Sequence, residues 1–208
     1  MKTGIVGLGL RAANVLKILI EDLPELDLVG YVDPDPCGLS ILDDVSHNLI
    51  RFESLDEMIE KCNLDLLWVA SPNHLHLDHI RVGLEAGLKV FSEKPIVTTK
   101  EDSFSLAKLI KKYGESQLIV GLVLRYSLHM REMRRILDAG TLGTITSLEA
   151  NEHIAPFHGS FFMRDWRRLE KYSGGFMLEK CCHDIDLYNS IVGDRPTRVA
   201  SFGGRNNF

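Results

Sequence analysis

The chain of 208 residues is long enough for one ordinary domain with a sizeable core or for two small domains, and its hydrophobic content of 45% is normal for a globular protein. The formal net charge of -5, with no basic block, argues against a nucleic acid or a membrane surface as the main partner. Small molecules are therefore the expected partners.

The N-terminus and the cysteines indicate a cytoplasmic protein. The opening stretch MKTGIVGLGL has a short apolar run that Arg11 and Asn14 soon interrupt, which is not typical of a signal peptide or a membrane span. The four cysteines lack the spacing of a disulfide-stapled secreted domain, so we expect all of them to be reduced thiols.

Apolar segments with strand character recur along the first part of the chain, at residues 3–8, 26–32, 64–70, 88–93 and 117–124. Segments with a helical period separate them. Nearly continuous apolar strands are typical of a parallel sheet that helices cover on both faces. The sequence therefore predicts an α/β fold with a doubly wound parallel sheet.

The turn after the first strand reads GLGLRA and has the spacing of a dinucleotide-binding loop. Gly7 permits the tight turn, Gly9 lets a pyrophosphate approach the backbone, and Ala12 allows close helix packing. The helix expected from about residue 11 to residue 21 would offer free N–H groups to the phosphates. This pattern predicts a Rossmann-type nucleotide site.

The second strand ends in Asp33, about twenty residues after the glycines, where an acid that binds the adenosine ribose is expected. Together with Pro34 and Asp35 it makes a negatively charged pocket, which would repel a 2′-phosphate. NAD is therefore favoured over NADP as the cofactor. The alternative is that Asp33 only starts a proline turn.

The stretch SPNHLHLDHI follows the third apolar segment. We expect Ser71 to cap the next helix with Pro72 at its first position, which leaves Asn73 and His76 near the carboxyl edge of the sheet. His76 and His79 share a helical face, but no third ligand is suitably spaced, so no metal site is predicted. His79 is interpreted as a residue of the helix surface.

The stretch FSEKPIV follows, and it places Lys94 between Glu93 and Pro95 at the end of a predicted strand. The nicotinamide half of a dinucleotide is expected at this edge, where Lys94 would face the reacting carbon. Taken alone, the Glu-Lys-Pro tripeptide is more typical of a surface turn.

The last part of the chain is expected to contain a helix over residues 176–192, with Ser173 as its cap and Gly193 at its end. Two strands are expected to begin near Thr144 and near Thr197. Two strands alone do not make an independently stable sheet, so the chain is interpreted as truncated.

Within the predicted helix, Glu179, His183 and Asp186 lie at positions i, i+4 and i+7 and form one polar stripe. Cys181 points well away from this stripe and Cys182 lies at its margin. Adjacent helical cysteines neither chelate one ion comfortably nor close an unstrained disulfide. The two thiols are therefore interpreted as packing residues.

Taken in order, the stretches GLGLRA, YVDPD, SPNHLH, SEKP and EKCCHDID resemble the glucose-fructose oxidoreductase and inositol dehydrogenase family, often called Gfo/Idh/MocA, over essentially the whole chain. The resemblance implies an NAD-binding Rossmann domain over residues 1–122. It also implies part of an α/β domain for substrate binding and oligomerisation over residues 123–208. Members of that family move hydride between a nicotinamide cofactor and a carbon of a sugar or cyclitol, and full-length relatives are expected to be homo-oligomers.

The resemblance also implies site residues. The cofactor-binding set is Gly7, Gly9, Ala12, Asp33, Ser71, Asn73, His76, Glu93, Lys94 and Arg125. The substrate-binding set is Lys94, Trp166, Arg167, Glu179 and His183, and the catalytic set is Lys94, His183 and Glu179.

In this scheme His183 is the general base or acid on the reacting hydroxyl, while Lys94 and Glu179 hold the substrate. Glu179 stands where the family usually has aspartate. Asp186 either fixes the tautomer of the histidine or caps internal hydrogen bonds. A neutral imidazole accepts a proton near pH 7, and an adjacent ammonium stabilises alkoxide character as hydride leaves.

Three functions stay open at this point. The leading one is an NAD-dependent oxidoreductase acting on a sugar, a cyclitol or a related polyol. The second is a glycosidase in which NAD oxidises the sugar transiently and is regenerated. The third is a non-catalytic regulator that responds to a dinucleotide, and the presence of both Lys94 and His183 argues against it.

Overall fold

The computed structural model describes residues 1–42 and 49–204, and the chain divides into two compact units. The first unit combines Met1–Leu122 with Ile154–Lys180. The second combines Val123–His153 with Cys181–Phe208. Residues 154–180 thus share a unit with the first 122 residues, and the predicted domain division at residue 122 stays a prediction.

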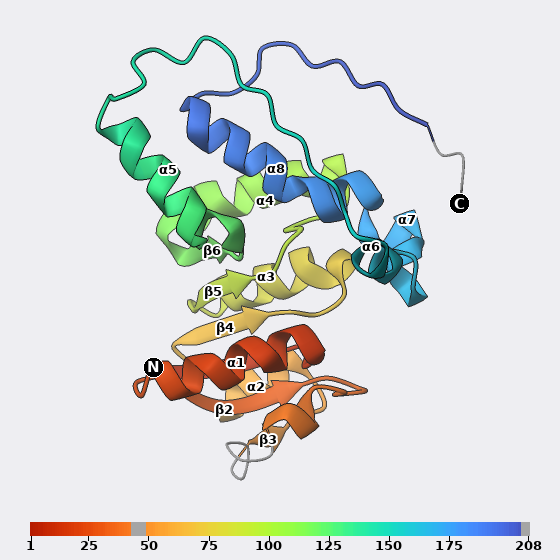
Figure 1. Cartoon of the computed structure of the whole chain (residues 1–208). Coiled ribbons are helices and arrows are strands. Elements are labelled where there is room, and N and C mark those ends of the chain that lie inside the picture. Colours follow the sequence, from red (N-terminus) through yellow and green to blue (C-terminus); the bar gives the residue numbers. More distant parts are fainter. Residues whose placement is uncertain (43–48, 205–208) are drawn as a thin grey trace. The chain divides into compact units, whose positions relative to one another are not determined.

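Six parallel strands form the sheet of the first unit, in the order β3-β2-β1-β4-β5-β6 (Figure 1). The strands are β1 (Lys2–Val6), β2 (Asp27–Val32), β3 (Ile50–Arg51), β4 (Leu66–Val69), β5 (Lys89–Ser92) and β6 (Leu118–Val120). The prediction of a doubly wound parallel sheet is confirmed. Strand β3 was not predicted, because a strand of two residues carries no recognisable periodicity.

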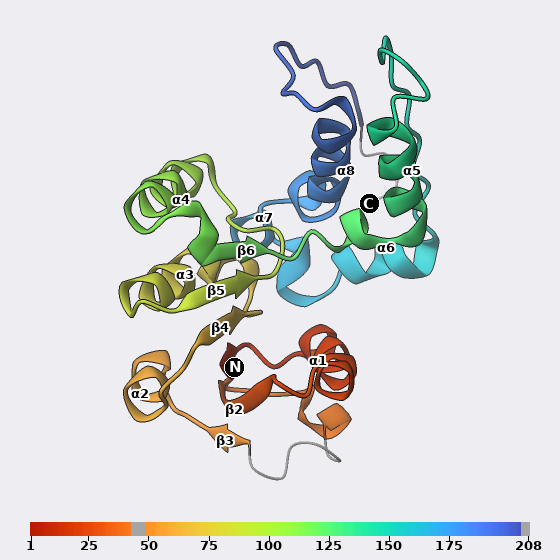
Figure 2. The ribbon, with the colours of Figure 1, turned by 90° about the vertical axis from the view of Figure 1, so that its left-hand side faces the viewer.

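Helices cover both faces of this sheet, as Figure 2 shows. The α-helices between these strands are α1 (Leu10–Asp22), α2 (Leu55–Lys61), α3 (His76–Glu85) and α4 (Lys100–Tyr113). One core cluster lies under α1 and includes Ile5 and Trp68, and the other lies under α2, α3 and α4 and includes Val6 and Val69. Neighbouring strand residues therefore enter opposite cores, which explains the nearly continuous apolar strands.

The register of the sheet aligns the carboxyl ends of its strands. Val6 pairs with both Val32 and Val69, Val69 pairs with Ser92, and Ser92 pairs with Val120. The loops after these strands consequently meet along one edge. Ligands bind at this edge in open α/β sheets, at the point between β1 and β4 where the strand order reverses.

Residues 154–180 add three short elements to the first unit: α6 (Pro156–Phe162), a 3-10 turn (Asp165–Arg168) and α7 (Glu170–Ser173). Helix α8 (Phe176–Val192) then begins in the first unit and continues in the second. Its bounds match the prediction, and Gly193 follows with a φ of 76°, a left-handed conformation that favours glycine after a helix.

The second unit contains α5 (Leu128–Asp138) and most of α8. The strands predicted near Thr144 and Thr197 are not formed, because both segments lack regular structure within the described residues (Figure 1). A strand needs a neighbour for its backbone hydrogen bonds, and no sheet is present in the described part of this unit. That prediction was wrong for this chain.

Candidate active site

The glycine loop lies between β1 and α1. Gly7 has a φ of 89°, and a Cβ atom on it would lie 2.4 Å from the Ser71 backbone nitrogen, so only glycine fits there. Gly9 is the N-cap of α1, and no described heavy atom beyond its chain neighbours lies within 4 Å of where its Cβ would be. Ala12 is buried in the core below. The open space and the unpaired first-turn N–H groups fit a pyrophosphate.

Asp33 is tied to this loop through its carboxylate. Its Oδ2 accepts a hydrogen bond from the Leu8 nitrogen at 2.6 Å, and its Oδ1 accepts one from the Asp35 nitrogen at 2.8 Å. A carboxylate has about four acceptor positions, so two stay available for ribose hydroxyls. Asp33 is therefore held in place beside the loop, as a ribose-binding acid needs to be.

Lys94, Glu179 and Asn73 form the polar cluster at the centre of the candidate site. The Lys94 ammonium donates to the Glu179 backbone oxygen at 2.8 Å and to Glu179 Oε1 at 3.2 Å. The Asn73 amide donates to Glu179 Oε2 and, at 3.2 Å, to the Ser173 carbonyl. Glu179 is 5% exposed, whereas the Lys94 side chain is 21% exposed. An ammonium has three N–H groups, so these two contacts leave one N–H of Lys94 for a further acceptor.

The segment around α7 brings Glu179 to this position. The Tyr172 ring lies 4.7 Å from the His74 ring, measured between centroids. Gly174 has a φ of 80°, and a Cβ on it would lie 3.0 Å from the Thr98 carbonyl oxygen. Ser173 is the last residue of α7, and its hydroxyl accepts from the Gly175 nitrogen at 3.1 Å. The predicted capping role of Ser173 is therefore wrong: it supports the turn before α8.

Ser71 does not cap a helix either. Its hydroxyl lies 2.9 Å from His79 Nδ1, and Leu75 takes the N-cap position of α3. Pro72 precedes a 3-10 turn over Asn73–Leu75. His79 is half-buried, and burial lowers its pKa, so the prediction of a surface histidine was also wrong. Its pairing with Ser71 holds the ring inward.

His76 is buried, and both of its ring nitrogens are occupied by the chain itself. Nδ1 lies 2.8 Å from the Pro95 carbonyl oxygen, and Nε2 lies 2.8 Å from the Ser71 carbonyl oxygen. Burial lowers the pKa of His76, and the two carbonyls oppose this effect. These contacts leave no ring nitrogen for a direct hydrogen bond to a cofactor.

Glu93 is flanked by two cations. Burial raises the pKa of its carboxyl, and the nearby charges of Arg11 and then Lys94 oppose this effect. Arg11 was absent from the predicted site. Its place as the second residue of α1, inside the glycine motif, is the sequence signal that could have included it.

Trp166 and Arg167 lie in the 3-10 turn before α7. The Arg167 guanidinium carbon lies 4.5 Å from the Trp166 ring centroid and 4.3 Å from that of Phe161. Burial lowers the pKa of Arg167, while the charges of Glu179 and Asp165 oppose this effect. Arg167 is therefore close enough to Glu179 to affect the electrostatics of the Lys94 cluster.

In the second unit, His183 lies on α8, and Arg125 pairs with Asp186 on the same helix. The guanidinium Nε and Nη2 donate to the two Asp186 oxygens at 2.6 and 2.5 Å, which raises the pKa of Arg125. Asp186 is therefore the ion-pair partner of Arg125. The two predicted roles of Asp186, fixing the histidine tautomer or capping internal hydrogen bonds, did not include this partner. Because α8 forms over its whole predicted range, Glu179, His183 and Asp186 keep their i, i+4, i+7 spacing.

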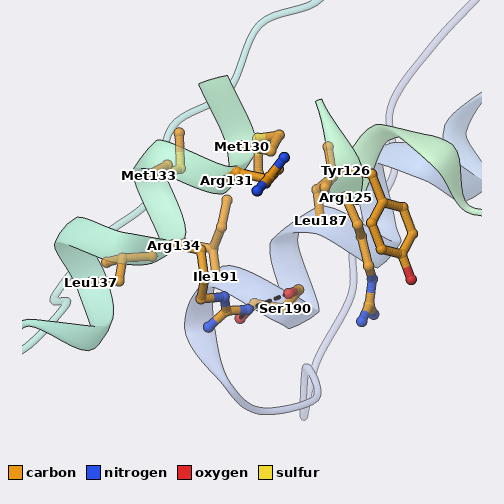
Figure 3. Close-up of a pocket in the computed structure, with 10 residues that line it drawn as sticks. All are labelled: Arg125, Tyr126, Met130, Arg131, Met133, Arg134, Leu137, Leu187, Ser190 and Ile191. Atoms are coloured by element: carbon orange, nitrogen blue, oxygen red, sulfur yellow. Dashed lines mark hydrogen bonds between the residues drawn. The ribbon is translucent and has the colours of Figure 1, made fainter. Parts of the chain in front are cut away.

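A pocket of about 450 Å³ lies between α5 and α8 in the second unit (Figure 3). Met130, Leu187 and Ile191 supply apolar walls, and Arg134 points toward Ser190 and donates to its carbonyl oxygen at 2.5 Å. Of the predicted site residues, the pocket lining includes Arg125. The residues that line this pocket therefore include none of the three residues of the Lys94 cluster.

Residues 1–42 and 49–204 contain no group of three or more histidine, cysteine, aspartate or glutamate side chains arranged to hold a metal ion. Within the same ranges, none of the helices has the length and apolar character that a membrane span requires.

The parallel sheet, the glycine loop and the lysine at the strand edge define a dinucleotide-binding protein of the Rossmann class. The profile described as "Oxidoreductase family, NAD-binding Rossmann fold" matches residues 1–122, and the GFO/IDH/MocA C-terminal domain profile matches residues 130–207. The chain belongs to this Gfo/Idh/MocA oxidoreductase family and carries its NAD-binding domain.

Several known proteins are similar to the chain over nearly its whole length. The Bacillus subtilis protein YteT is 28% identical over 97% of this chain and 49% of that protein. An Escherichia coli 2,7-anhydro-N-acetylneuraminate hydratase is 25% identical over 97% of this chain and 52% of that enzyme. The apo crystal structure of scyllo-inositol dehydrogenase from Lactobacillus casei has a TM-score of 0.75 and 26% identity, covering 93% of this chain and 55% of that one. The chain spans about half the length of the curated relatives it matches.

Proposed function

We propose that this chain is part of an NAD-dependent oxidoreductase that moves hydride between NAD(H) and a hydroxyl-bearing carbon of a sugar, cyclitol or related polyol. The cluster of Lys94, Glu179 and Asn73 carries this proposal. It holds an ammonium with one N–H beyond its two contacts to Glu179, at the same carboxyl edge of the sheet that carries the glycine loop. A scyllo-inositol dehydrogenase 26% identical to this chain was crystallised with NAD(H) and scyllo-inositol, which supports this substrate class.

Bound NAD would accept the hydride. The side chains of the protein would bind and orient the substrate: Lys94 donates a hydrogen bond to the reacting oxygen, and Glu179 and Asn73 orient Lys94. His183 is the proposed acid or base on the same hydroxyl. Trp166 and Arg167 are the proposed substrate contacts. We also propose that residues 1–122 bind the cofactor and residues 123–208 belong to the substrate domain.

The cofactor assignment can be tested by titrating the chain with NADH and NADPH and following nicotinamide fluorescence. We expect tighter binding of NADH, because the Asp33 carboxylate accepts from ribose hydroxyls and repels a 2′-phosphate. Asp33→Asn should weaken NADH binding about tenfold, since a hydrogen bond to a charged group is worth about 1.5–3 kcal/mol. Asp35→Asn, two residues away, is the matched control. No binding of NADH to the folded wild-type chain would end the assignment.

Turnover tests the reaction itself. A panel of inositols and sugars with NAD should give net NADH with at least one polyol, and Lys94→Ala should abolish this NADH production. The hydratases among the relatives favour one competing outcome, in which no net NADH accumulates. Release of sugar from a glycoside without NADH accumulation would support the glycosidase in place of the dehydrogenase.

A further inference from the structure

The buried side chain of His76 makes two contacts that constrain its protonation state. It is 1% exposed, and its Nδ1 and Nε2 each lie 2.8 Å from a backbone carbonyl oxygen. A carbonyl oxygen can only accept, so each contact needs an N–H on the ring. A neutral imidazole carries a single N–H. Only the doubly protonated imidazolium satisfies both contacts at once.

The two carbonyls belong to neighbouring strand ends. Ser71 follows β4, and Pro95 follows β5 directly after Lys94. The Glu93 nitrogen continues the ladder by donating to the Val69 carbonyl at 2.8 Å. Beyond that bond, His76 links the segment that follows β4 to the segment that follows β5, where both leave the sheet. The ring therefore holds the backbone from which the Lys94 side chain extends.

The charges that face His76 come from three elements. Burial is the largest influence on the pKa of His76 and lowers it, and His74 in the 3-10 turn and His79 on α3 also disfavour the charged ring. The two carbonyl contacts and then the Glu179 carboxylate on α8 favour the charged ring. The geometry of the two 2.8 Å contacts, rather than this balance, assigns the charged form. Glu179 also accepts from Lys94 and from Asn73. One buried carboxylate is thus shared as counter-charge by the lysine and by the histidine, which links the histidine electrostatically to the catalytic cluster.

We propose that His76 is a positioning residue for Lys94: as an imidazolium it ties the end of β4 to the end of β5 and so fixes the Lys94 backbone. The consequence for turnover rests on the proposed oxidoreductase function. The protonation of the ring does not, so the two ideas can fail separately.

The protonation state is measured directly on the wild-type chain. Histidine labelled with ¹⁵N is observed by two-bond proton–nitrogen correlation at about pH 7, where an ordinary histidine is mostly neutral. His76 is assigned by through-bond correlation from its backbone, so no variant has to fold. We expect both ring nitrogens to be protonated. One unprotonated nitrogen at that pH would overturn the proposal.

The positioning role is measured on Lys94 itself. His76→Gln removes one of the two donors, and the rate at which an amine-acylating reagent modifies Lys94 is followed by mass spectrometry. Loss of a hydrogen bond from a charged donor should speed this modification about tenfold, with the rate at exposed Lys108 on α4 unchanged. His129→Gln, an exposed position on α5, is the control.

An equal rise at Lys94 and Lys108 would mean that His76 only supports the fold, and it would overturn the positioning role. An unchanged rate at Lys94 would overturn it as well. Failure of the wild-type chain to bind NADH would refute the proposed function and leave the ring protonation and the Lys94 rates to be judged separately.

Discussion

Replacing Glu179 by glutamine should destabilise the first unit. The buried carboxylate accepts from Lys94 through Oε1 and from Asn73 through Oε2. Glutamine has nearly the same shape but presents one oxygen and one NH₂ group. One of the two donors then faces another donor, which leaves a buried polar group without an acceptor.

The size of the effect follows from the surroundings of the pair. An unsatisfied buried donor costs about 1–3 kcal/mol, and removing one partner of a fully buried ion pair costs about 3–5 kcal/mol. Lys94 is 21% exposed and keeps the Glu179 backbone oxygen at 2.8 Å, so the smaller range applies. We expect Glu179→Gln to lower the free energy of unfolding by about 2 kcal/mol.

Urea unfolding followed by tryptophan fluorescence measures this change. Both tryptophans, Trp68 and Trp166, belong to the first unit, so the signal reports the part of the chain that contains the mutation. Glu60→Gln, at an exposed position of α2, should shift stability by less than about 0.5 kcal/mol. A Glu179→Gln chain as stable as the wild type would refute the idea that the carboxylate holds both donors.

Two further substitutions test the glycine loop and the core. Gly7→Ala should cost more than about 2 kcal/mol in urea unfolding, because the new Cβ would lie 2.4 Å from the Ser71 nitrogen in addition to the positive φ. Gly87 also has a positive φ, of 77°, but open space surrounds it, so Gly87→Ala should cost only about 1 kcal/mol of stability through backbone strain. Equal losses of stability in the two glycine variants would refute the steric explanation. Leu16→Ala empties a fully buried position of α1 and should cost about 2–5 kcal/mol, whereas Leu10→Ala, at a residue 57% exposed, should be nearly neutral. A small effect at Leu16 would show that α1 does not cover the sheet as described.

The helices and strands that local sequence patterns specify could be predicted. Five of the six strands lie at the predicted apolar segments, and α1 and α8 lie where their periodicity indicated. Gly7 and Gly9 were recognisable because a tight strand-to-helix turn has few chemical solutions. The predicted strands near Thr144 and Thr197 failed for the opposite reason, since a strand depends on a partner that its own residues do not specify.

Hydrogen-bond partners were less predictable than positions. The sequence placed Ser71 as a helix cap, yet its hydroxyl pairs with His79, eight residues away. It gave no signal that both ring nitrogens of His76, which stays a predicted cofactor-binding residue, lie against backbone carbonyl oxygens. Each of these polar groups has several possible partners within reach, and the packing of the strand ends selects among them.

By itself, the sequence determined the parallel sheet, the glycine loop and the range of α8, because alternation, turn chemistry and helical period act between residues close together along the chain. Only the tertiary structure decided that Asn73 and Glu179, 106 residues apart, share a hydrogen bond and that Lys94 joins them. The short elements of residues 154–180 bring these groups together. Such contacts depend on how elements pack against one another, which no local period encodes.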